Sequence, residues 1–471
     1  FPVAALGAFK TGAVVVNINP LYTPQELLGI LHDSGAAVLV VLANVAHTVA
    51  AVIERTSVQR VVITEVGDLL GPVAGWLTNF AVRHVRKMIR HYHIGGSLRF
   101  AHVLQRGSAL QHRHGVPAAN YPADDLAVLQ YTGGTTGVSK AAMLTHRNLL
   151  DNVGQIVETM QHDCPGSGAL MVAPLPLYHI YAFCLNFLLS QHKGHHVLLI
   201  PNPRDADGMA KTLAKVRMNG FIGINTLYQN LVNHAGFRRL DFSHLQVATS
   251  GGMALSPQVV ARWLELTGKS ILEGYGLTEC SPMVSCNTYA QQRLGTAGKV
   301  ARRTELRLVQ ADGSLAAVDE PGEICVRGPQ VMRGYWNNAT ETAQVLDAEG
   351  WLRTGDIGKL DADGFLTIVD RIKDLIVVSG FNVYPAEIEE HVLRHPDISD
   401  ACAIGCGDDL APRIKLFIVS RNPALTAEQV LTHCRGGLAG YKVPKEVEFR
   451  STLPKSAVGK VLRRELRQQS A

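Results

Sequence analysis

The sequence has few cysteines, and none lies in a pattern typical of a cross-linked or zinc-bound scaffold. Eight cysteines occur in 471 residues, and no two form a C-x-x-C pair. Such spacing favours reduced thiols in a cytoplasmic compartment. The chain also lacks an apolar run near the roughly 20 residues that a membrane-spanning helix needs. We therefore expect at most a peripheral contact with a membrane.

Charge is also sparse. Charged residues make up 18% of the chain and leave a formal net charge of +5. Domains that bind nucleic acids carry a much stronger basic excess, so we expect no nucleic-acid partner. The sequence lacks the phosphate-loop motif G-x-x-x-x-G-K-[ST] of kinases and ATPases, and it lacks the G-x-S-x-G elbow of serine hydrolases.

Short β-branched runs alternate with helical patterns through most of the chain. The runs at 12–18 and 36–42 flank a segment, 23–35, that predicts a helix. Thr23 and Glu26 form a capping box at its start, a proline occupies the first helical position, and a glycine ends it. A strand, a capped helix and a second strand are typical of a largely parallel sheet.

The pattern changes after about residue 300. Segments 305–314, 322–328 and 364–370 predict strands joined by Asp-Gly turns, and hence a small antiparallel region. We predict an α/β protein with a large N-terminal domain at 1–370, made of largely parallel sheets flanked by helices plus this small β region. A smaller, mobile α+β C-terminal domain follows at 371–471. Because the chain starts without methionine inside a helical pattern, we expect the N-terminal part of the large domain to be missing.

The segment 76–94 predicts a basic amphipathic helix. Its apolar face would carry Leu77, Ala81, Val85, Met88 and Tyr92. Its basic residues are Arg83, Arg86, Lys87 and Arg90. A helix of this kind can lie on an anionic membrane surface, and the alternative is an ordinary helix packed on its own domain. Both interpretations stay open.

The stretch YTGGTTGVSKAAMLTH at 131–146 is dense in groups that bind phosphate. Glycines allow backbone amides to approach phosphate oxygens. Thr135, Thr136 and Ser139 add hydroxyl donors, and Lys140 adds a cation. Following the strand-like run at 126–132, the loop is predicted to be a phosphate cradle.

Side chains further along the chain suit other parts of a nucleotide. Tyr275 offers a flat ring, Thr278 a hydroxyl, and Glu279 a hard oxygen for Mg²⁺ beside a phosphate. Asp356 could accept from ribose hydroxyls, and Arg371 could donate as a fork. Taken singly, each could equally be an ordinary solvated side chain.

The order of these pieces resembles the acyl-adenylate-forming superfamily of ligases, adenylation domains and luciferases, over essentially the whole chain. Besides the loop at 131–140, the motifs that carry the resemblance are PLPLYHI at 174–180, SGGM at 250–253, YGLTE at 275–279, RGYW at 333–336, TGD at 354–356, DRIKD at 370–374 and PKSAVGK at 454–460. The segment 349–389 looks like the corresponding region of fatty-acyl-CoA ligases. The sequences EGYGLTEC and LPKSAVGKVLRREL are especially similar to bacterial long-chain-fatty-acid–CoA ligases.

The resemblance implies an ATP-dependent ligase that joins a fatty acid to AMP and then transfers the acyl group to coenzyme A. The implied ATP- and AMP-binding residues are Thr132, Gly133, Gly134, Thr135, Thr136, Gly137, Ser139, Lys140, Gly251, Gly252, Tyr275, Gly276, Thr278, Asp356, Arg371 and Lys460. The implied catalytic residues are Lys460, Glu279, Thr278, His179 and Lys140, with Glu279 as the ligand of Mg²⁺. Gly380 and Phe381 would bind coenzyme A, and Asp370 and Lys373 would form the hinge.

Several alternatives stay open at this point. The substrate could be a medium-chain or aromatic acid instead of a long-chain one, or the chain could be a non-catalytic relative that binds acyl groups or nucleotides. His179 could equally be a satisfied core histidine. A homodimer and a peripheral contact with the inner membrane are further expectations beside the fatty acid substrate.

Overall fold

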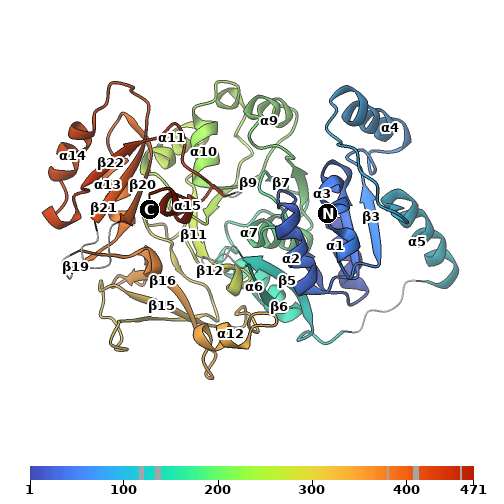
Figure 1. Ribbon diagram of the computed structural model, residues 1–471, viewed down its shortest axis with the longest axis horizontal. Coiled ribbons are helices and arrows are strands. Elements are labelled where there is room, and N and C mark those ends of the chain that lie inside the picture. Colours follow the sequence, from blue (N-terminus) through green and yellow to red (C-terminus); the bar gives the residue numbers. More distant parts are fainter. Residues whose placement is uncertain (116–120, 133–138, 379–380, 407–412, 457–458, 471) are drawn as a thin grey trace. The chain divides into compact units, whose positions relative to one another are not determined.

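The computed structural model describes the chain except residues 116–120, 133–138, 379–380, 407–412, 457–458 and 471 (Figure 1). By its internal contacts the chain divides into two compact units. The first unit contains Phe1–Arg147 and Met332–Thr340, and the second contains Asn148–Val331 and Glu341–Ala471.

The first unit contains two small sheets. One is parallel and consists of β2 (Val38–Leu42), β3 (Arg60–Thr64) and β4 (Leu98–Arg99). The other places β1 (Val15–Asn17) parallel to β5 (Leu126–Thr132), and β5 antiparallel to β6 (Lys140–Thr145). The helices of this unit are α1 (Pro2–Lys10), α2 (Pro24–Ser34), α3 (Ala46–Ala50), α4 (Pro72–Phe80) and α5 (Phe100–His114).

The helix predicted at 23–35 is confirmed as α2. The Thr23 side chain accepts from the backbone of Glu26, the Glu26 carboxylate accepts from the backbone of Thr23, and Gly35 ends the helix in the left-handed conformation. Its buried face, which includes Leu27 and Leu31, packs in one apolar cluster with residues of β2, β3 and α3. The predicted strand, helix, strand order is therefore present in this unit.

The helix predicted at 76–94 is wrong in its bounds. Helix α4 already begins at Pro72, and one π-helical segment, η3 (Ala81–Val85), continues it. No helix is present from Arg86 to Ile94, a stretch that is described throughout. Lys87 adopts a positive φ of 50°, which an α-helix of L-residues does not accept. The chain then turns back, because Ile94 is buried in the cluster around α2.

The second unit is dominated by a seven-stranded sheet in the order β13-β12-β11-β10-β9-β7-β8. Strands β8, β7, β9, β10 and β11 run parallel, and β12 and β13 are antiparallel additions. Their bounds are β7 (Leu170–Ala173), β8 (His196–Leu199), β9 (Gly220–Gly223), β10 (Val247–Gly251), β11 (Leu272–Gly276), β12 (Met283–Cys286) and β13 (Lys299–Val300). The main helices around it are α6 (His146–Thr159), α7 (Ile180–Ala182), α8 (Ser190–Lys193), α9 (Ala206–Leu213), α10 (Asn225–Val232) and α11 (Pro257–Thr267).

The core of this part is aromatic and apolar. Trp263 of α11 is fully buried, and its ring lies 4.7 Å from that of Tyr228 and 5.6 Å from that of Phe221. The cluster also includes residues of β7, β9 and β10. A parallel sheet with helices packed on it is what the sequence predicted.

The predicted small β region is also confirmed. It is an antiparallel four-stranded sheet of β14 (Glu305–Val309), β15 (Gly322–Arg327), β16 (Leu352–Leu360) and β17 (Leu366–Arg371). The short helix α12 (Ala339–Val345) precedes β16.

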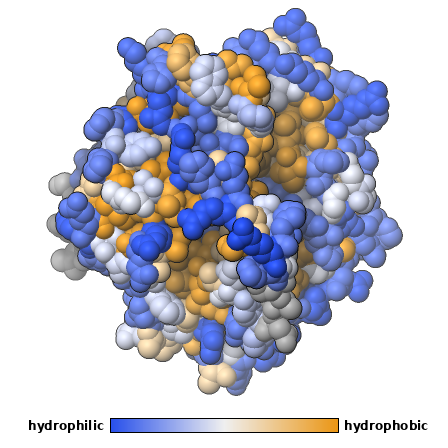
Figure 2. Space-filling view, turned by 90° about the vertical axis from the view of Figure 1, so that its right-hand side faces the viewer, coloured by the Kyte–Doolittle hydropathy of each residue, from blue (hydrophilic) through white to orange (hydrophobic). Residues whose placement is uncertain are grey.

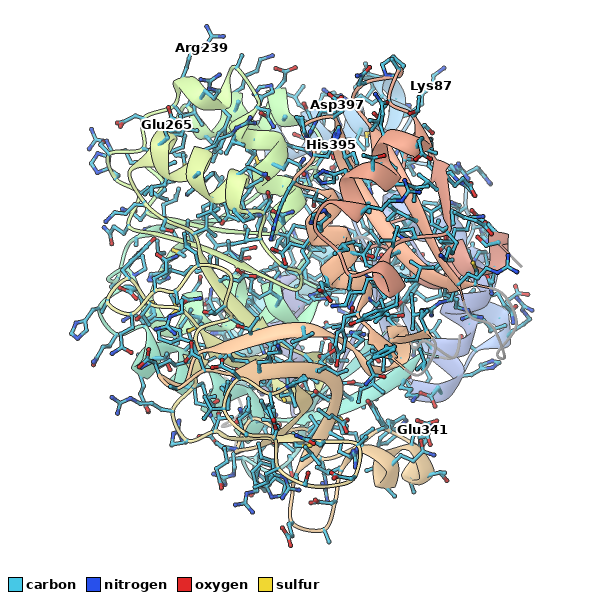
Figure 3. All side chains as sticks on the ribbon, turned by 90° about the vertical axis from the view of Figure 1, so that its left-hand side faces the viewer. Lys87, Arg239, Glu265, Glu341, His395 and Asp397 are labelled. Atoms are coloured by element: carbon cyan, nitrogen blue, oxygen red, sulfur yellow. The ribbon has the colours of Figure 1, made fainter. Side chains whose placement is uncertain are left out.

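The C-terminal part of the second unit mixes helices with strands, as predicted. Its strands are β18 (Ile376–Val378), β19 (Phe381–Val383), β20 (Ile398–Cys406), β21 (Arg413–Ser420) and β22 (Glu446–Phe449). Its helices are α13 (Pro385–Val392), α14 (Ala427–Arg435) and α15 (Arg463–Ser470). Figure 3 labels His395 and Asp397 in the turn after α13, where the Asp397 amide donates to His395 Nδ1 at 3.2 Å. Among the described residues of the whole chain, no helix is both long and apolar enough to cross a bilayer.

Candidate active site

The second unit brings together three side chains that the sequence placed in separate motifs. The hydroxyl of Tyr275, on β11, donates to Asp356 Oδ2 at 2.7 Å. Arg371 Nε lies 2.8 Å from Asp356 Oδ1. The register of the small sheet explains the second contact, because Asp356 on β16 and Arg371 on β17 are directly paired. The carboxylate of Asp356, whose residue is only 4% exposed, is thus held by two donors.

Lys460 is in the same electrostatic environment. Burial lowers the pKa of its ammonium to about 8, and the next largest contribution is the positive charge of Arg371. Asp356 acts in the opposite direction, and Lys373 adds a further lowering contribution. The predicted catalytic lysine and the predicted ribose-binding pair are therefore close enough to influence one another.

The turn before Lys460 holds it against the rest of the unit. The Ser456 amide donates to the Lys460 carbonyl at 2.8 Å. Gly459 has a φ of 77°, and a Cβ there would lie 2.7 Å from the Thr226 hydroxyl at the start of α10. Both the backbone conformation and this close approach require glycine. The turn at the start of the basic tail therefore packs on α10.

His179 is half-buried and lies within the electrostatic influence of Lys460. Burial, followed by the charge of Lys460, lowers the pKa of its imidazole to about 4. His179 is thus neutral near pH 7. Its Nδ1 accepts from the amide of Tyr181 at 3.3 Å and caps the short helix α7. A structural role is visible, and a role beside the substrate stays a prediction.

The glycines and the acidic residue near β11 lie in neighbouring strands and turns. Gly251 ends β10, Gly252 follows it, and Gly276 ends β11. Thr278 and Glu279 belong to one 3-10 turn, Thr278–Cys280, directly after β11. Among the described residues no group of three or more His, Cys, Asp or Glu could hold a metal by itself. A single partly exposed carboxylate nevertheless fits Mg²⁺, which commonly binds one or two protein carboxylates together with substrate phosphates and water.

The phosphate loop belongs to the first unit. Thr132 and Lys140 face each other at the ends of β5 and β6, and the Thr132 hydroxyl donates to the Lys140 carbonyl at 3.3 Å. Lys140 Nζ lies 5.4 Å from the centre of the Tyr335 ring. Ser139 is described directly before β6. The predicted residues Gly133, Gly134, Thr135, Thr136 and Gly137 lie outside the described residues.

The residues predicted for the hinge and for coenzyme A lie at and after β17. The Asp370 carboxylate accepts from the amides of Arg371 and Ala386, at 2.7 and 2.8 Å. Burial, followed by the charge of Arg371, lowers the pKa of Lys373. Phe381 opens β19, is exposed, and stacks on Tyr441 with ring centres 4.7 Å apart. Gly380 lies outside the described residues.

Two features of the site were missed at the sequence level. Glu273 lies two residues before Tyr275 on β11, and therefore on the same face of the sheet. Burial raises the pKa of Glu273 to about 7, and its Oε1 accepts from the Leu255 amide at 3.2 Å. Strand alternation from Tyr275 could have identified it.

The second missed feature is a set of ion pairs made by helix α15, which follows Lys460 in the chain. Arg463, at the start of α15, contacts both carboxylate oxygens of Glu389 on α13 at 2.7 and 2.8 Å. Arg467 Nη2 donates to Asp374 Oδ1 at 2.9 Å. The tail helix is thereby fastened to the segment directly after the predicted hinge. Only the three-dimensional fold brings these groups together, so no local sequence pattern indicated them.

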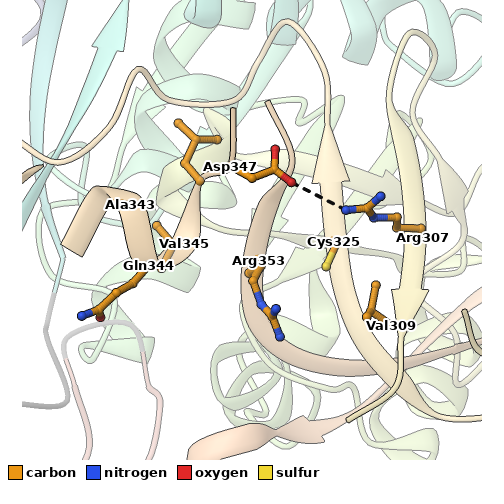
Figure 4. A pocket seen from close by; sticks show the side chains of 9 residues that line it. Arg307, Val309, Cys325, Ala343, Gln344, Val345, Asp347 and Arg353 are labelled. Atoms are coloured by element: carbon orange, nitrogen blue, oxygen red, sulfur yellow. Dashed lines mark ion pairs between the residues drawn. The ribbon is translucent and has the colours of Figure 1, made fainter. Parts of the chain in front are cut away.

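A separate pocket of about 290 Å³ lies at the edge of the small sheet (Figure 4). It is lined by β14, β15, β16 and the segment 343–347, and Arg307 Nη2 lies 3.7 Å from Asp347 Oδ2 beside it. None of the residues predicted for the active site lines this pocket. It is therefore not part of the candidate active site.

The comparisons with known proteins identify the family of the chain. Residues 1–336 match the AMP-binding enzyme family, and residues 387–460 match the AMP-binding enzyme C-terminal domain. The chain therefore belongs to the AMP-binding enzyme family, and the predicted resemblance to acyl-adenylate-forming enzymes is confirmed.

Among its relatives are bacterial long-chain-fatty-acid–CoA ligases. The chain is 48% identical to the one from Salmonella typhimurium over 472 aligned positions, which cover 100% of this chain and 83% of that protein. It is 35% identical to the one from Bacillus subtilis over 98% of this chain and 82% of that protein.

Solved structures of the same fold support the assignment. The anthranilate CoA ligase AuaEII in complex with anthranoyl-AMP superimposes with a TM-score of 0.83 at 26% identity, covering 99% of this chain and 84% of that one. ATP-bound MatB from Rhodopseudomonas palustris superimposes with a TM-score of 0.81 at 27% identity, covering 99% of this chain and 86% of that one. The predicted α/β fold class is confirmed.

Proposed function

We propose that this chain is an ATP-dependent long-chain-fatty-acid–CoA ligase. The observation that carries the proposal is the half-buried Lys460, whose pKa responds to the charges of the paired Asp356 and Arg371. Attack on an α-phosphate builds up negative charge on the phosphate oxygens, and a cation held beside them stabilises that charge. A carboxylate next to this cation can bind the ribose of the same nucleotide. The relatives named long-chain-fatty-acid–CoA ligase, which align along the whole chain, support the choice of substrate class.

In the first half-reaction, a carboxylate oxygen of the fatty acid attacks the α-phosphorus of ATP. A P–O bond to the carboxylate forms, the bond to the bridging oxygen breaks, and pyrophosphate leaves. Lys460 would bridge the carboxylate and the α-phosphate, and Thr278 would contact the same phosphate. Asp356 and Arg371 would bind the ribose, and Tyr275 would stack on the adenine.

The remaining groups would surround the phosphates and the acyl end. The loop from Thr132 to Lys140 would grip the β- and γ-phosphates. Mg²⁺ bound at Glu279 would offset phosphate charge. Gly251 and Gly252 would line the side of the adenine and the acyl carboxylate, with His179 close to that carboxylate.

In the second half-reaction, the thiol of coenzyme A attacks the acyl carbonyl. A C–S bond forms, the C–O bond to AMP breaks, and the thiol proton is released. The proposed domains at 1–370 and 371–471 would serve this exchange. Rotation at Asp370 and Lys373 would withdraw Lys460 and bring Gly380 and Phe381 to the acyl carbonyl.

Exchange of labelled pyrophosphate into ATP, driven by an added acid, tests the first half-reaction. A panel of long-chain, medium-chain and aromatic acids should give the highest kcat/KM with the long-chain acids. A preference for medium-chain or aromatic acids would replace long-chain acids as the substrate class. If no acid of the panel drives exchange, only the non-catalytic alternative remains. Adding coenzyme A should then yield acyl-CoA and AMP.

A homodimer is part of the same proposal. Light scattering coupled to size-exclusion chromatography tests it, and a mass equal to one chain at all concentrations would contradict it. The same proposal includes a peripheral contact with the inner membrane.

A further inference from the structure

Helix α4 in the first unit presents large apolar side chains to solvent. Val73 is 71% exposed, Trp76 64% and Phe80 46%, and Gly75 is the buried residue of this helix. The rings of Trp76 and Phe80 stack with centres 5.5 Å apart. We call the exposed set the α4 patch; its members are Leu69, Leu70, Val73, Trp76, Leu77 and Phe80. Figure 2 views this side of the molecule and shows apolar side chains gathered near the top.

The outward orientation of the α4 patch is fixed by the opposite side of the helix. Gly75 packs so closely on the carbonyl of Gly67 that a Cβ on either residue would collide with the other's backbone. The Gly67 amide donates to Asn79 Oδ1 at 2.7 Å, and Arg83 pairs with Glu65. A helix anchored by glycines and polar groups, with its aromatic residues left outside, is the reverse of ordinary packing on a domain core.

Positive charge adjoins the α4 patch. Residues 69–94 contain three arginines and one lysine, and no Asp or Glu. Arg86, Lys87 and Arg90 are exposed, and Figure 3 shows Lys87 at the edge of the molecule. Val85, directly before Arg86, and Met88, directly after Lys87, are exposed as well. Tryptophan and phenylalanine beside lysine and arginine are typical of surfaces that lie at the interface of an anionic membrane.

We propose that the α4 patch and the basic turn after it dock on an anionic phospholipid membrane. The aromatic side chains enter the boundary between headgroups and acyl chains, and the three exposed cations contact lipid phosphates. The charge of this surface favours an anionic membrane over a second copy of the chain as its partner. A symmetric dimer through the same patch would bring two identical sets of basic residues to one interface, and residues 69–94 offer no acidic side chain to neutralise them. Anionic lipids complement the turn instead.

Flotation of the full chain with vesicles tests the proposal, without ATP or fatty acid. We expect binding to phosphatidylcholine vesicles that contain about one third phosphatidylglycerol, weaker binding to pure phosphatidylcholine, and loss of binding at high salt. The double variant Trp76→Ser/Phe80→Ser and the triple variant Arg86→Gln/Lys87→Gln/Arg90→Gln should each weaken binding at least about tenfold.

A matched control carries the same apolar-to-serine change at another exposed place. Leu315 and Val318 are 67% and 60% exposed on the turn between β14 and β15, and Leu315→Ser/Val318→Ser should bind like the parent chain. Circular dichroism must show all variants folded. Of the four tryptophans only Trp76 is exposed, so its emission should shift to shorter wavelength on vesicles and be quenched by brominated lipids.

Vesicle binding that Trp76→Ser/Phe80→Ser leaves unchanged would overturn the proposal. So would a dimer that this variant converts to a monomer, because a second copy would then cover the patch. The measurement does not use the chemistry of the proposed ligase. Failure of acid-dependent pyrophosphate exchange therefore leaves this proposal standing, and failure of vesicle binding leaves the proposed ligase standing.

Discussion

The rate of adenylation should fall at alkaline pH because Lys460 loses its proton. Burial and the neighbouring Arg371 bring the pKa of this ammonium to about 8 from its usual 10.5. Only the charged form can offset the negative charge of the carboxylate and the α-phosphate. In the free enzyme the charged fraction, and with it kcat/KM for pyrophosphate exchange, should decline about tenfold for each pH unit above 8.

Two substitutions separate Lys460 from other titrating groups. Lys460→Arg carries a guanidinium that stays charged throughout this range, so its alkaline decline should disappear even if its rate is lower. Arg371→Gln removes the largest electrostatic contribution that lowers the pKa of Lys460, so the decline should move to higher pH. The exchange must be measured without coenzyme A, because a free thiol titrates with a pKa of about 8.5.

The variant Lys460→Ala measures how much Lys460 contributes to the rate of adenylation. Loss of one preorganised charged donor typically lowers a rate by about a hundredfold to a thousandfold, so pyrophosphate exchange should fall by that factor. Thioester formation from supplied acyl-AMP should be nearly unaffected, since Lys460 is proposed to act in the first half-reaction only. The assignment fails if both half-reactions fall equally. It also fails if Lys460→Arg keeps the alkaline decline near pH 8.

Two further changes test the surroundings of this lysine. Tyr275→Phe keeps the ring but removes the 2.7 Å donor to the buried Asp356 carboxylate, so the free energy of unfolding should fall by about 2 kcal/mol. KM for ATP should rise because Asp356 is then less firmly held for the ribose, and an unchanged KM would show that this hydrogen bond does not support nucleotide binding. Glu389→Gln leaves Arg463 with only the more distant carboxylate of Asp374, at 3.6 Å, and should lower the free energy of unfolding in urea by about 3 kcal/mol. The exposed Glu465→Gln is its control, and equal effects of the two would show that the Glu389–Arg463 pair contributes nothing.

The fold could be predicted from the sequence where a local pattern determines it. The capping box at Thr23 opens a helix at the predicted residue, because the side-chain and backbone partners lie within one turn. The prediction of a helix over 76–94 was wrong in its bounds because a local pattern does not determine the structure there. Its periodicity continues past Val85, but Lys87 leaves helical geometry and Ile94 returns to the core around α2. Tertiary packing overrides periodicity there.

Candidate residues of the site could be named from the sequence, but their arrangement could not. Motif order named Tyr275, Asp356, Arg371 and Lys460 as candidates, yet no pattern shows that one carboxylate receives both a tyrosine hydroxyl and a guanidinium. That contact depends on the pairing of β16 with β17. The sequence did not indicate Glu273, because a glutamate in a strand predicts no site until the buried face of the strand is known.

The cations of this site lower one another's affinity for protons, and this explains how substrate binding would act on Lys460. The charge of Arg371 lowers the pKa of both Lys373 and Lys460, and Asp356 acts on both lysines in the opposite direction without cancelling the shift. A lowered pKa means that the free enzyme holds these protons weakly, because each cation is partly desolvated and lies near another. An anionic nucleotide and a carboxylate would supply the missing negative charge and raise both pKa values again. Binding of the substrates would therefore favour the charged form of Lys460, the form that adenylation requires.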